Sequence, residues 1–398
     1  MGGENIMREA VIVSAVRTAI AKENGALRDV PPEALAAVVM KEAVVRSGLQ
    51  KPELIDEVIF GHCLGAPGCL GRMSLLMAGL PMEIPAITID RQCGSGSTAV
   101  NLAATHIRAE VGDIYLAGGV ESMTRQPYLM EKPTAAYQRV PPRFTHRPLS
   151  PQEIGDPPMG ITAENVAERF NISREEQDEF GYLSQVKAAR ALKEGRFKEQ
   201  IMPVVIPQKK GDPVVFEVDE HPRPNTTLEA LAKLRPVFKK DGTVTAGTSS
   251  GINDGAGALL VTSREKAEEL GLKPLAVIRA YGAGGVDPNI MGMGPVPATR
   301  KALAMAGLTI DQLDVIELNE AFAAQALACC KELGIDWRNQ KKMNPNGGAI
   351  ALGHPIAGSL AILTVKAVYE LHRTNGQYAL ITACCGGGQG VATIIEKC

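Results

Sequence analysis

The chain repeats one order of sequence patterns in its two halves. Each half contains a helical pattern, an apolar strand pattern, a glycine-rich turn that opens a second helix, and a closing strand. These patterns stand at 32–48, 56–61, 92–97 and 113–119 in the first half and at 299–307, 308–319, 353–359 and 378–388 in the second. Helices that alternate with short β-rich runs indicate an α/β fold. The period of roughly 120 residues exceeds that of solenoid repeats, so it predicts two fused, similar domains.

The residues between the halves follow a different pattern. Segment 127–158 carries eight prolines without a sustained helical or strand period, which predicts a long ordered loop or lid. A helical pair follows at 162–170 and 173–192, the second opening with a capping box at Ser173. Glycine-rich segment 243–260 then returns to strand-like composition and is expected to rejoin the first half.

The charge balance narrows the classes of partner. Lys and Arg number 42 against 44 Asp and Glu, without basic runs, so nucleic acid or an anionic membrane surface is not expected as the main partner. No apolar run approaches the ~18 residues that span a bilayer, and MGGENIMREA lacks the apolar centre of a signal peptide. The terminal IIEKC is not a peroxisomal address. We therefore expect a cytoplasmic protein without a membrane segment.

Eight cysteines include two adjacent pairs and no CxxC knuckle, so no metal site is predicted. In a large cytoplasmic chain most should be small buried hydrophobes, with one or two reactive thiols. They are Cys63, Cys69, Cys93, Cys329, Cys330, Cys384, Cys385 and Cys398.

Cys93 has the most distinctive environment, since it follows an apolar strand and opens a helix. The amides at a helix N-terminus favour the thiolate and are expected to lower the thiol pKa. His354, in GHP, occupies the equivalent position of the second half, so the duplication predicts that the two side chains meet. A thiol facing an imidazole is the pairing used in cysteine acyl transfer. The alternatives are a packed cysteine and a core histidine.

Two further positions in the second half carry polar or nucleophilic groups at strand ends. Cys384 precedes three glycines whose amides can supply an oxyanion hole, or it is a buried cysteine. Asn319, followed by Glu320, stands where a helix begins, so its amide either serves the site or caps that helix.

At these residues the sequence resembles the thiolases, which comprise acetyl-CoA acetyltransferases and 3-ketoacyl-CoA thiolases. The resemblance extends over the full length and rests on four blocks in family order and spacing. They are CGSGSTA at 93–99, NEAFAAQ at 319–325, NPNGGAIALGHP at 344–355 and CCGGGQG at 384–390.

The resemblance implies an α/β thiolase fold: two similar, duplicated halves in a layered αβαβα arrangement with an inserted loop domain. The N-terminal half is expected at 1–121 plus about 252–273, and the C-terminal half at 274–398. The loop domain, at 122–251, would cover CoA. The resemblance also implies a homodimer or homotetramer, as is usual in the family.

The resemblance also implies a reaction and its residues. The enzyme would cleave 3-ketoacyl-CoA with CoA, or condense two acetyl-CoA, through an acyl-cysteine on Cys93. His354 would accept the thiol proton and Cys384 would be the second acid and base. Asn319 would hold a water that stabilises the enolate with His354, and the amides of Cys93 and Gly386 would form the second oxyanion hole. CoA and acyl-CoA would be substrates, with no tightly bound cofactor.

For CoA binding the resemblance points to a set of residues in and beyond the loop domain. Arg223 would contact adenine and phosphate, Ser250 would accept from a pantetheine amide, and Met291 would lie beside the acyl group. The remaining positions would line the tunnel: Ala246, Phe238, Met159, Ala321 and Phe322.

Two positions depart from the short-chain biosynthetic pattern, and one segment departs from the general family pattern. Pro158 stands in place of a pantetheine-facing histidine, and Ala230 replaces a CoA-contacting serine. These changes, with segment 127–178, look closer to degradative thiolases. After GHP the family usually continues IGASGAR, whereas IAGSLAI at 356–362 lacks the final glycine and arginine. Two other functions remain as alternatives: a Cys-His-Asn acyltransferase like the ketoacyl synthases, and a non-catalytic acyl-CoA-binding scaffold.

Overall fold

The structure is a computed structural model that describes residues 8–65, 67–135, 137 and 141–398. Most of the N-terminal stretch that was examined for a signal peptide therefore lies outside the described residues. In the part that is described, no helix combines the length and apolar character needed to cross a membrane.

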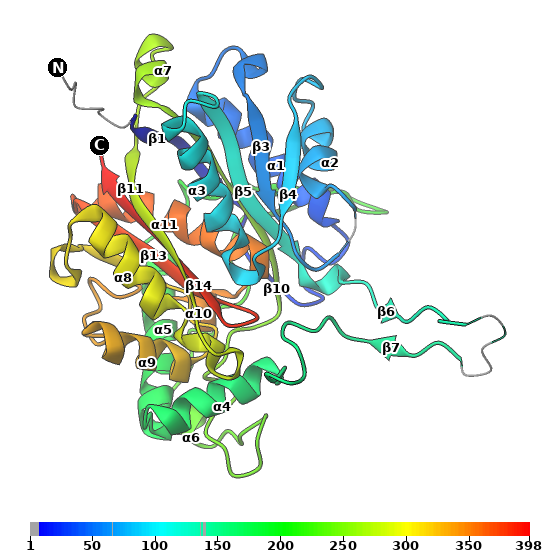
Figure 1. Ribbon diagram of the computed structural model, residues 1–398, viewed down its shortest axis with the longest axis vertical. Coiled ribbons are helices and arrows are strands. Elements are labelled where there is room, and N and C mark those ends of the chain that lie inside the picture. Colours follow the sequence, from blue (N-terminus) through cyan, green and yellow to red (C-terminus); the bar gives the residue numbers. More distant parts are fainter. Residues whose placement is uncertain (1–7, 66, 136, 138–140) are drawn as a thin grey trace.

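Ten of the described strands form one large sheet built from two equivalent halves (Figure 1). In each half two antiparallel pairings are followed by a parallel one, in the orders β1–β10–β5–β3 and β11–β14–β13–β12. The halves join where β1 meets β11 over only two residue pairs. The first half contains β1 (Ala10–Arg17), β3 (Glu57–Gly61), β4 (Ala86–Ile89), β5 (Ile114–Ser122) and β10 (Asn253–Ser263), with the short β2 (Ala21–Lys22) beside β10. The second contains β11 (Ala276–Gly285), β12 (Val315–Leu318), β13 (Tyr378–Cys385) and β14 (Gln389–Lys397). The predicted duplication is confirmed.

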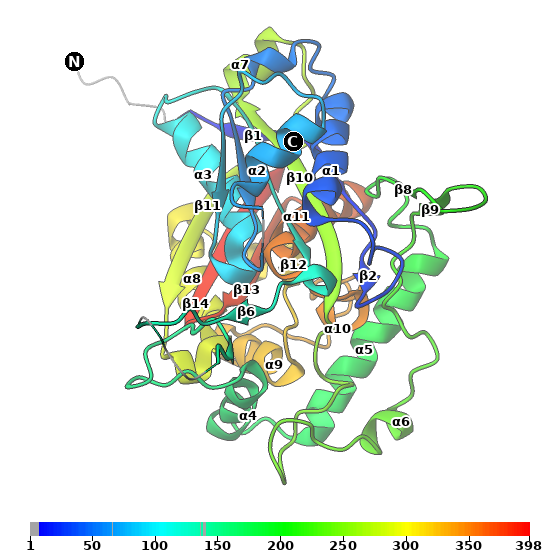
Figure 2. The ribbon, with the colours of Figure 1, turned by 90° about the vertical axis from the view of Figure 1, so that its right-hand side faces the viewer.

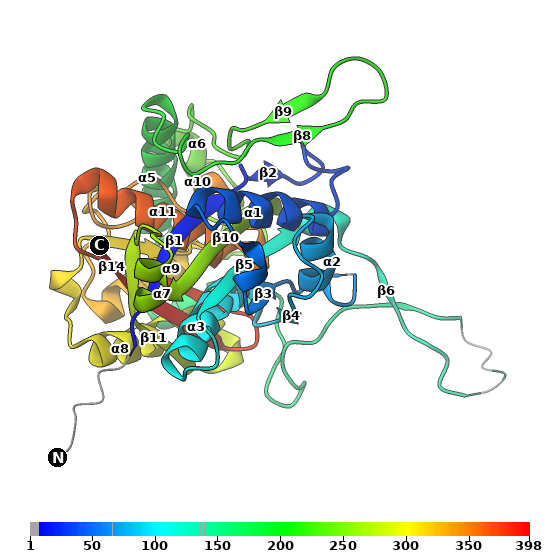
Figure 3. The ribbon, with the colours of Figure 1, turned by 90° about the horizontal axis from the view of Figure 1, so that it is seen from above.

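Helices cover both faces of each half-sheet (Figures 1 and 3). The central layer holds α3 (Ser95–Arg108) and α11 (Ser359–Thr374), which touch each other and contact both half-sheets. The outer layer of the first half is α1 (Pro32–Ser47) with α2 (Leu70–Met77). The outer layer of the second is α8 (Pro295–Ala306) with α9 (Ala323–Leu333). The apolar side chains form three cores accordingly, one under each outer layer and one around α3 and α11. This is the predicted αβαβα arrangement.

The chain between β5 and β10 leaves the sheet and returns to pair with β5. It holds two ribbons and three helices. The β8–β9 ribbon, α5 and α6 lie at the right of Figure 2, and β6 and the β8–β9 ribbon project from the body in Figure 3. These elements are β6 (Leu129–Met130), β7 (Phe144–Thr145), α4 (Met159–Arg169), α5 (Arg174–Lys193), β8 (Val204–Ile206), β9 (Val214–Phe216) and α6 (Leu228–Ala232). Segment 127–158 was expected to lack strands, but β6 and β7 pair over two residues each. So short a pairing leaves no periodic pattern in the sequence. The capping box at Ser173 is present.

Two short helices complete the fold. Helix α7 (Arg264–Glu269) follows β10 directly and is capped by the side chain of Ser263. Helix α10 (Ala349–Leu352) lies beside α5 and leads into the GHP segment.

Candidate active site

Cys93 lies in a single 3-10 turn, Gln92–Gly94, immediately before α3. The preceding residue, Gln92, has a φ of +48°. This left-handed backbone conformation makes the sharp turn between β4 and α3. Cys93 as a whole residue is partly exposed.

His354 reaches the same point from the second half. Its Nε2 lies 3.2 Å from Sγ of Cys93, and its Nδ1 lies 2.6 Å from Oγ of Ser359. The backbone amide of His354 donates to Oδ1 of Asn253 at 2.9 Å. If the Ser359 hydroxyl accepts from Nδ1, then Nε2 carries a free lone pair toward the thiol. The arrangement therefore suits His354 as the base that accepts the Cys93 proton.

The pKa expected for Cys93 at a helix start is wrong for this structure. Burial raises the pKa of the thiol to about 12, although the amides of Cys93 and Gly386 act in the opposite direction. Burial also lowers the pKa of His354 to about 4. Loss of hydration disfavours both charged forms and outweighs the helix terminus. The resting pair is thus a neutral thiol and a neutral imidazole, so the proton must move when the sulfur attacks.

Asn319 does not cap the helix that follows it. Helix α9 begins at Ala323 with Phe322 as its N-cap residue, so the Asn319 amide is free for another role. Its Nδ2 lies 3.5 Å from Nε2 of His354, and the side chain is buried. The structure brings Asn319 to the imidazole edge that Cys93 also faces.

Cys384 is the penultimate residue of β13 and is buried. Burial raises the pKa of its thiol, and the nearby Cys93 thiol raises it further. The glycines after it turn the chain back toward Cys93, where the amides of Cys93 and Gly386 hydrogen-bond to the Cys93 sulfur. Two convergent amides at a nucleophile can hold an oxyanion that forms there.

A cavity of about 940 Å³ opens beside these groups, between the chain from β5 to β10 and the second half. Its wall includes six of the eight residues predicted to bind CoA, together with Pro158 and Ala230. The six are Arg223, Ser250, Ala246, Phe238, Met159 and Phe322. Ala321 lies behind the wall and accepts from the Ser250 amide, whereas Met291 is buried in the core that contains Cys384.

The cavity ends short of the reacting sulfur, because its wall contains neither Cys93 nor His354. Its inner residues are nevertheless close in sequence to the site. Phe322 follows Asn319 by three positions, and Gly251 precedes the Asn253 that holds the His354 backbone. Phe238 and Phe322 meet edge to face in this wall, with ring centroids 5.9 Å apart.

The sequence did not identify three residues that support the site. Ser359 and Asn253 hold the imidazole and backbone of His354. Leu149 packs against Gly386, where an added Cβ would lie 2.7 Å from a Leu149 methyl group. Only Ser359 had a sequence signal, namely its place at the start of the helix that follows GHP.

Comparison with known families matches both parts of the chain. "Thiolase, N-terminal domain" matches residues 10–265, and "Thiolase, C-terminal domain" matches residues 272–397.

Individual proteins match over nearly the full chain. An acetyl-CoA acetyltransferase of Syntrophomonas wolfei is 50% identical over 98% of this chain and 99% of its own length. A beta-ketoadipyl-CoA thiolase of Escherichia coli is 48% identical over 98% of this chain and 100% of its own length. The solved structure of human mitochondrial 3-ketoacyl-CoA thiolase superimposes with a TM-score of 0.92 at 41% identity, over 99% of this chain and 100% of that one.

Proposed function

Since the chain belongs to the thiolase family, we propose that Cys93 and His354 carry its acyl transfer through an acyl-Cys93 intermediate. The enzyme is a CoA-dependent acyltransferase that cleaves 3-ketoacyl-CoA or condenses acetyl-CoA. The observation that best supports the roles of these two residues is the 3.2 Å separation of Sγ and Nε2.

In the cleavage direction, the Cys93 thiol attacks the 3-keto carbon as its proton passes to Nε2 of His354. The oxyanion formed there is held by the amides of Cys93 and Gly386, and each such donor typically contributes ~3 kcal/mol. When the carbon–carbon bond breaks, the departing acetyl-CoA enolate is held by His354 and by a water on Asn319. Cys384, whose raised pKa keeps its proton at rest, protonates the α-carbon.

The second half-reaction returns the acyl group to CoA. The Cys384 thiolate left by the first step takes the proton of the incoming CoA thiol, and the CoA sulfur attacks the carbonyl carbon of acyl-Cys93. The bond between that carbon and the Cys93 sulfur then breaks, and Cys93 takes back its proton from His354. Condensation is the same sequence reversed. CoA is thus a substrate, and the scheme requires no tightly bound cofactor.

We place CoA in the 940 Å³ cavity, under the loop domain proposed at 122–251. Arg223 suits phosphate and adenine by charge and stacking. The Ser250 hydroxyl suits a pantetheine amide, and the apolar wall suits the pantetheine chain. Met291 and Ala321 support this wall from behind.

We further propose that the physiological direction is cleavage of chains longer than acetoacetyl-CoA. Pro158 and Ala230 both lie in the cavity wall and remove two polar groups expected of short-chain biosynthetic enzymes. Thiolysis of a ladder of 3-ketoacyl-CoA from four to sixteen carbons tests this. Activity confined to acetoacetyl-CoA would contradict it.

Two variants test the division of labour. Cys93→Ala should form no acyl-enzyme while CoA affinity changes by no more than a few fold, because the thiol is not a binding group. Cys384→Ala should still be acylated by acetyl-CoA but should fail in the carbon–carbon step. Thiolysis that persists in Cys93→Ala would overturn the assignment, and full activity in Cys384→Ala would favour the ketoacyl-synthase alternative. An unmodified Cys93 after iodoacetamide, with CoA still bound, would favour the scaffold.

The exposed surface beside β4 supports a homo-oligomer. Strand β4 is the last strand of its half-sheet in the described part of the chain, and α2 beside it exposes Met73, Leu76 and Met77. An exposed strand edge flanked by apolar side chains is a surface that another chain can cover. We propose that a second copy does so, giving a dimer or a dimer of dimers.

The cysteines support a location in the cytoplasm. All eight cysteines are unpaired, which fits a reducing compartment.

A further inference from the structure

Four charged side chains are buried together beneath the site, outside the groups that the mechanism uses. Lys366 on α11 is 1% exposed and its Nζ lies 2.8 Å from Oε2 of Glu317 on β12. Glu320 and Lys187, from the chain after β12 and from α5, are also almost fully buried. We call Lys187, Glu317, Glu320 and Lys366 the buried charge cluster.

The cluster binds the backbone of a single segment, 343–350. Lys366 Nζ donates to the Gly347 carbonyl at 2.8 Å, and Lys187 Nζ donates to the Met343 carbonyl at 3.0 Å. On the same segment, Glu320 Oε2 accepts from the Ile350 amide at 3.2 Å. The segment is therefore held at both ends and near its middle by side chains of the cluster.

A neutral side chain of the segment ties it to the strand that carries Asn319. Asn344 exchanges hydrogen bonds with both backbone groups of Leu318 at 2.9 Å, and its Nδ2 donates to Glu320 Oε1 at 2.7 Å. Asn344 itself has a φ of +42°, a conformation that needs such support. Segment 343–350 leads through α10 to His354, and Glu317 precedes Asn319 by two positions. The cluster thus links the two stretches that deliver the 3.5 Å contact between Asn319 and His354.

Folding stability is a poor reason for such a cluster. Burying an ion pair costs desolvation that its attraction rarely exceeds, and apolar replacements of both partners are often neutral or better. Here Glu317 Oε1 also has no hydrogen-bond partner among the described residues. What an apolar pair could not supply is the donor to the Gly347 carbonyl, which fixes where that turn lies.

Lys366 also explains the departure after GHP. The family pattern IGASGAR places an arginine at 362, where this chain has Ile362, buried in the apolar core with Leu352. The cation of α11 instead stands at Lys366, one helical turn further on and on the same face of the helix.

We propose that Lys366, paired with Glu317, is a positioning residue that holds segment 343–350 in the register that brings His354 and Asn319 together. The proposal rests on the function proposed above. Its effect is expected chiefly on the carbon–carbon step, because Asn319 acts in that step alone.

The test is Lys366→Met, which keeps the length of the side chain and removes the donor. We expect kcat for acetoacetyl-CoA thiolysis to fall about tenfold to hundredfold, as displacement of a catalytic group by about 1 Å does. KM for CoA should stay within about twofold, since Lys366 does not line the cavity. Acetyl-CoA/CoA exchange, which does not use Asn319, should fall less than thiolysis.

A second variant separates positioning from stability. Lys366→Met leaves Glu317 buried without its partner, so the melting temperature should fall; adding Glu317→Gln removes that charge and should restore it. Thiolysis should remain low in the double variant, because the Gly347 carbonyl still lacks its donor. If thiolysis recovers together with the melting temperature, the role is merely structural and the proposal is wrong.

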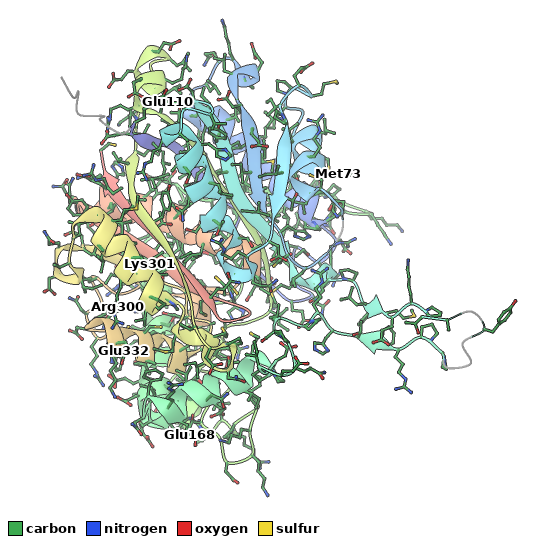
Figure 4. All side chains as sticks on the ribbon, in the orientation of Figure 1. Met73, Glu110, Glu168, Arg300, Lys301 and Glu332 are labelled. Atoms are coloured by element: carbon green, nitrogen blue, oxygen red, sulfur yellow. The ribbon has the colours of Figure 1, made fainter. Side chains whose placement is uncertain are left out.

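Lys301→Met is the matched control. Lys301 lies on the outer face of α8 (Figure 4) and donates to the Ala283 carbonyl at 2.8 Å from an exposed position. It should leave both rates unchanged. If unmodified enzyme shows neither exchange nor thiolysis, the proposed function fails; if it shows both and Lys366→Met matches it, only the present inference fails.

Discussion

At the scale of single residues, the site works with neutral partners. Burial favours the uncharged thiol and imidazole, so the mechanism proposed above activates Cys93 through a base 3.2 Å away rather than through a standing thiolate. The orientation of that base depends on Ser359, whose hydroxyl lies 2.6 Å from Nδ1.

Ser359→Ala tests this orientation. Without the hydroxyl the imidazole can adopt the other tautomer, which places a proton on Nε2 and blocks proton transfer from Cys93. We expect the acylation rate to fall about tenfold to hundredfold, measured as release of CoA from acetyl-CoA in a single turnover. Ser359→Thr keeps the hydroxyl and should retain more of that rate than Ser359→Ala; equal rates would count against the role.

The depressed pKa of His354 makes the stability of the fold depend on pH. Burial keeps the imidazole neutral in the folded state down to its pKa of about 4, whereas in the unfolded chain it binds a proton near its ordinary pKa of 6.5. Between these values the unfolded chain carries more protons, so stability is lost as pH falls through this window. Relative to His354→Asn, the protein should lose about 2 kcal/mol between pH 7 and pH 5. Denaturant unfolding of both proteins at the two pH values measures the difference, and parallel losses would refute it.

At the scale of elements, the duplicated helices α3 and α11 meet closely enough to exclude a side chain. A Cβ added at Gly96 would lie 2.8 Å from the Ala361 amide and 2.9 Å from the Ala357 carbonyl oxygen. This contact brings the start of α3, and hence Cys93, against the start of α11, which follows His354.

Gly96→Ala should therefore lose both stability and activity. Alanine normally gains about 1 kcal/mol over glycine within a helix. Here overpacking against backbone atoms should outweigh that gain, for a net loss of about 1–2 kcal/mol. Gly68→Ala is the control, because an added Cβ there meets nothing within 4 Å. Thermal unfolding that shows Gly96→Ala as stable as the control would contradict the close-packing argument.

At the scale of the whole molecule, one end of the sheet remains open. The edge of β4 and the exposed side chains of α2, including Met73 on the right of Figure 4, form the surface proposed for a second copy. The opposite end differs, since β12 is bridged there by Met343.

Charged substitutions on α2 test this surface. Met73→Glu with Met77→Glu places four like charges across a dimer seam and should give monomers in analytical ultracentrifugation. Val205→Glu with Val215→Glu, on the exposed face of the β8–β9 ribbon, is the control and should leave the assembly size unchanged. Unaltered assembly in the α2 variant would place the interface elsewhere.

The sequence by itself determined the α/β class and the duplication. It also singled out Cys93, Asn319, His354 and Cys384 as candidate site residues. These follow from local patterns, because strand ends, glycine turns and helix starts are written in consecutive residues. The duplication even predicted that Cys93 and His354 would meet, since equivalent positions of two similar halves face each other.

Only the tertiary structure decided the protonation of the site and the groups that support it. The thiol pKa depends on how completely water is excluded, which a helix start does not reveal, and burial reversed the expected direction. Asn253 and Lys366 act through contacts between distant segments, which no local pattern encodes, whereas Ser359 lies only five residues from His354. The loss of the arginine after GHP could be read in the sequence, whereas the ion pair of Lys366 with Glu317 became visible only when α11 packed against β12.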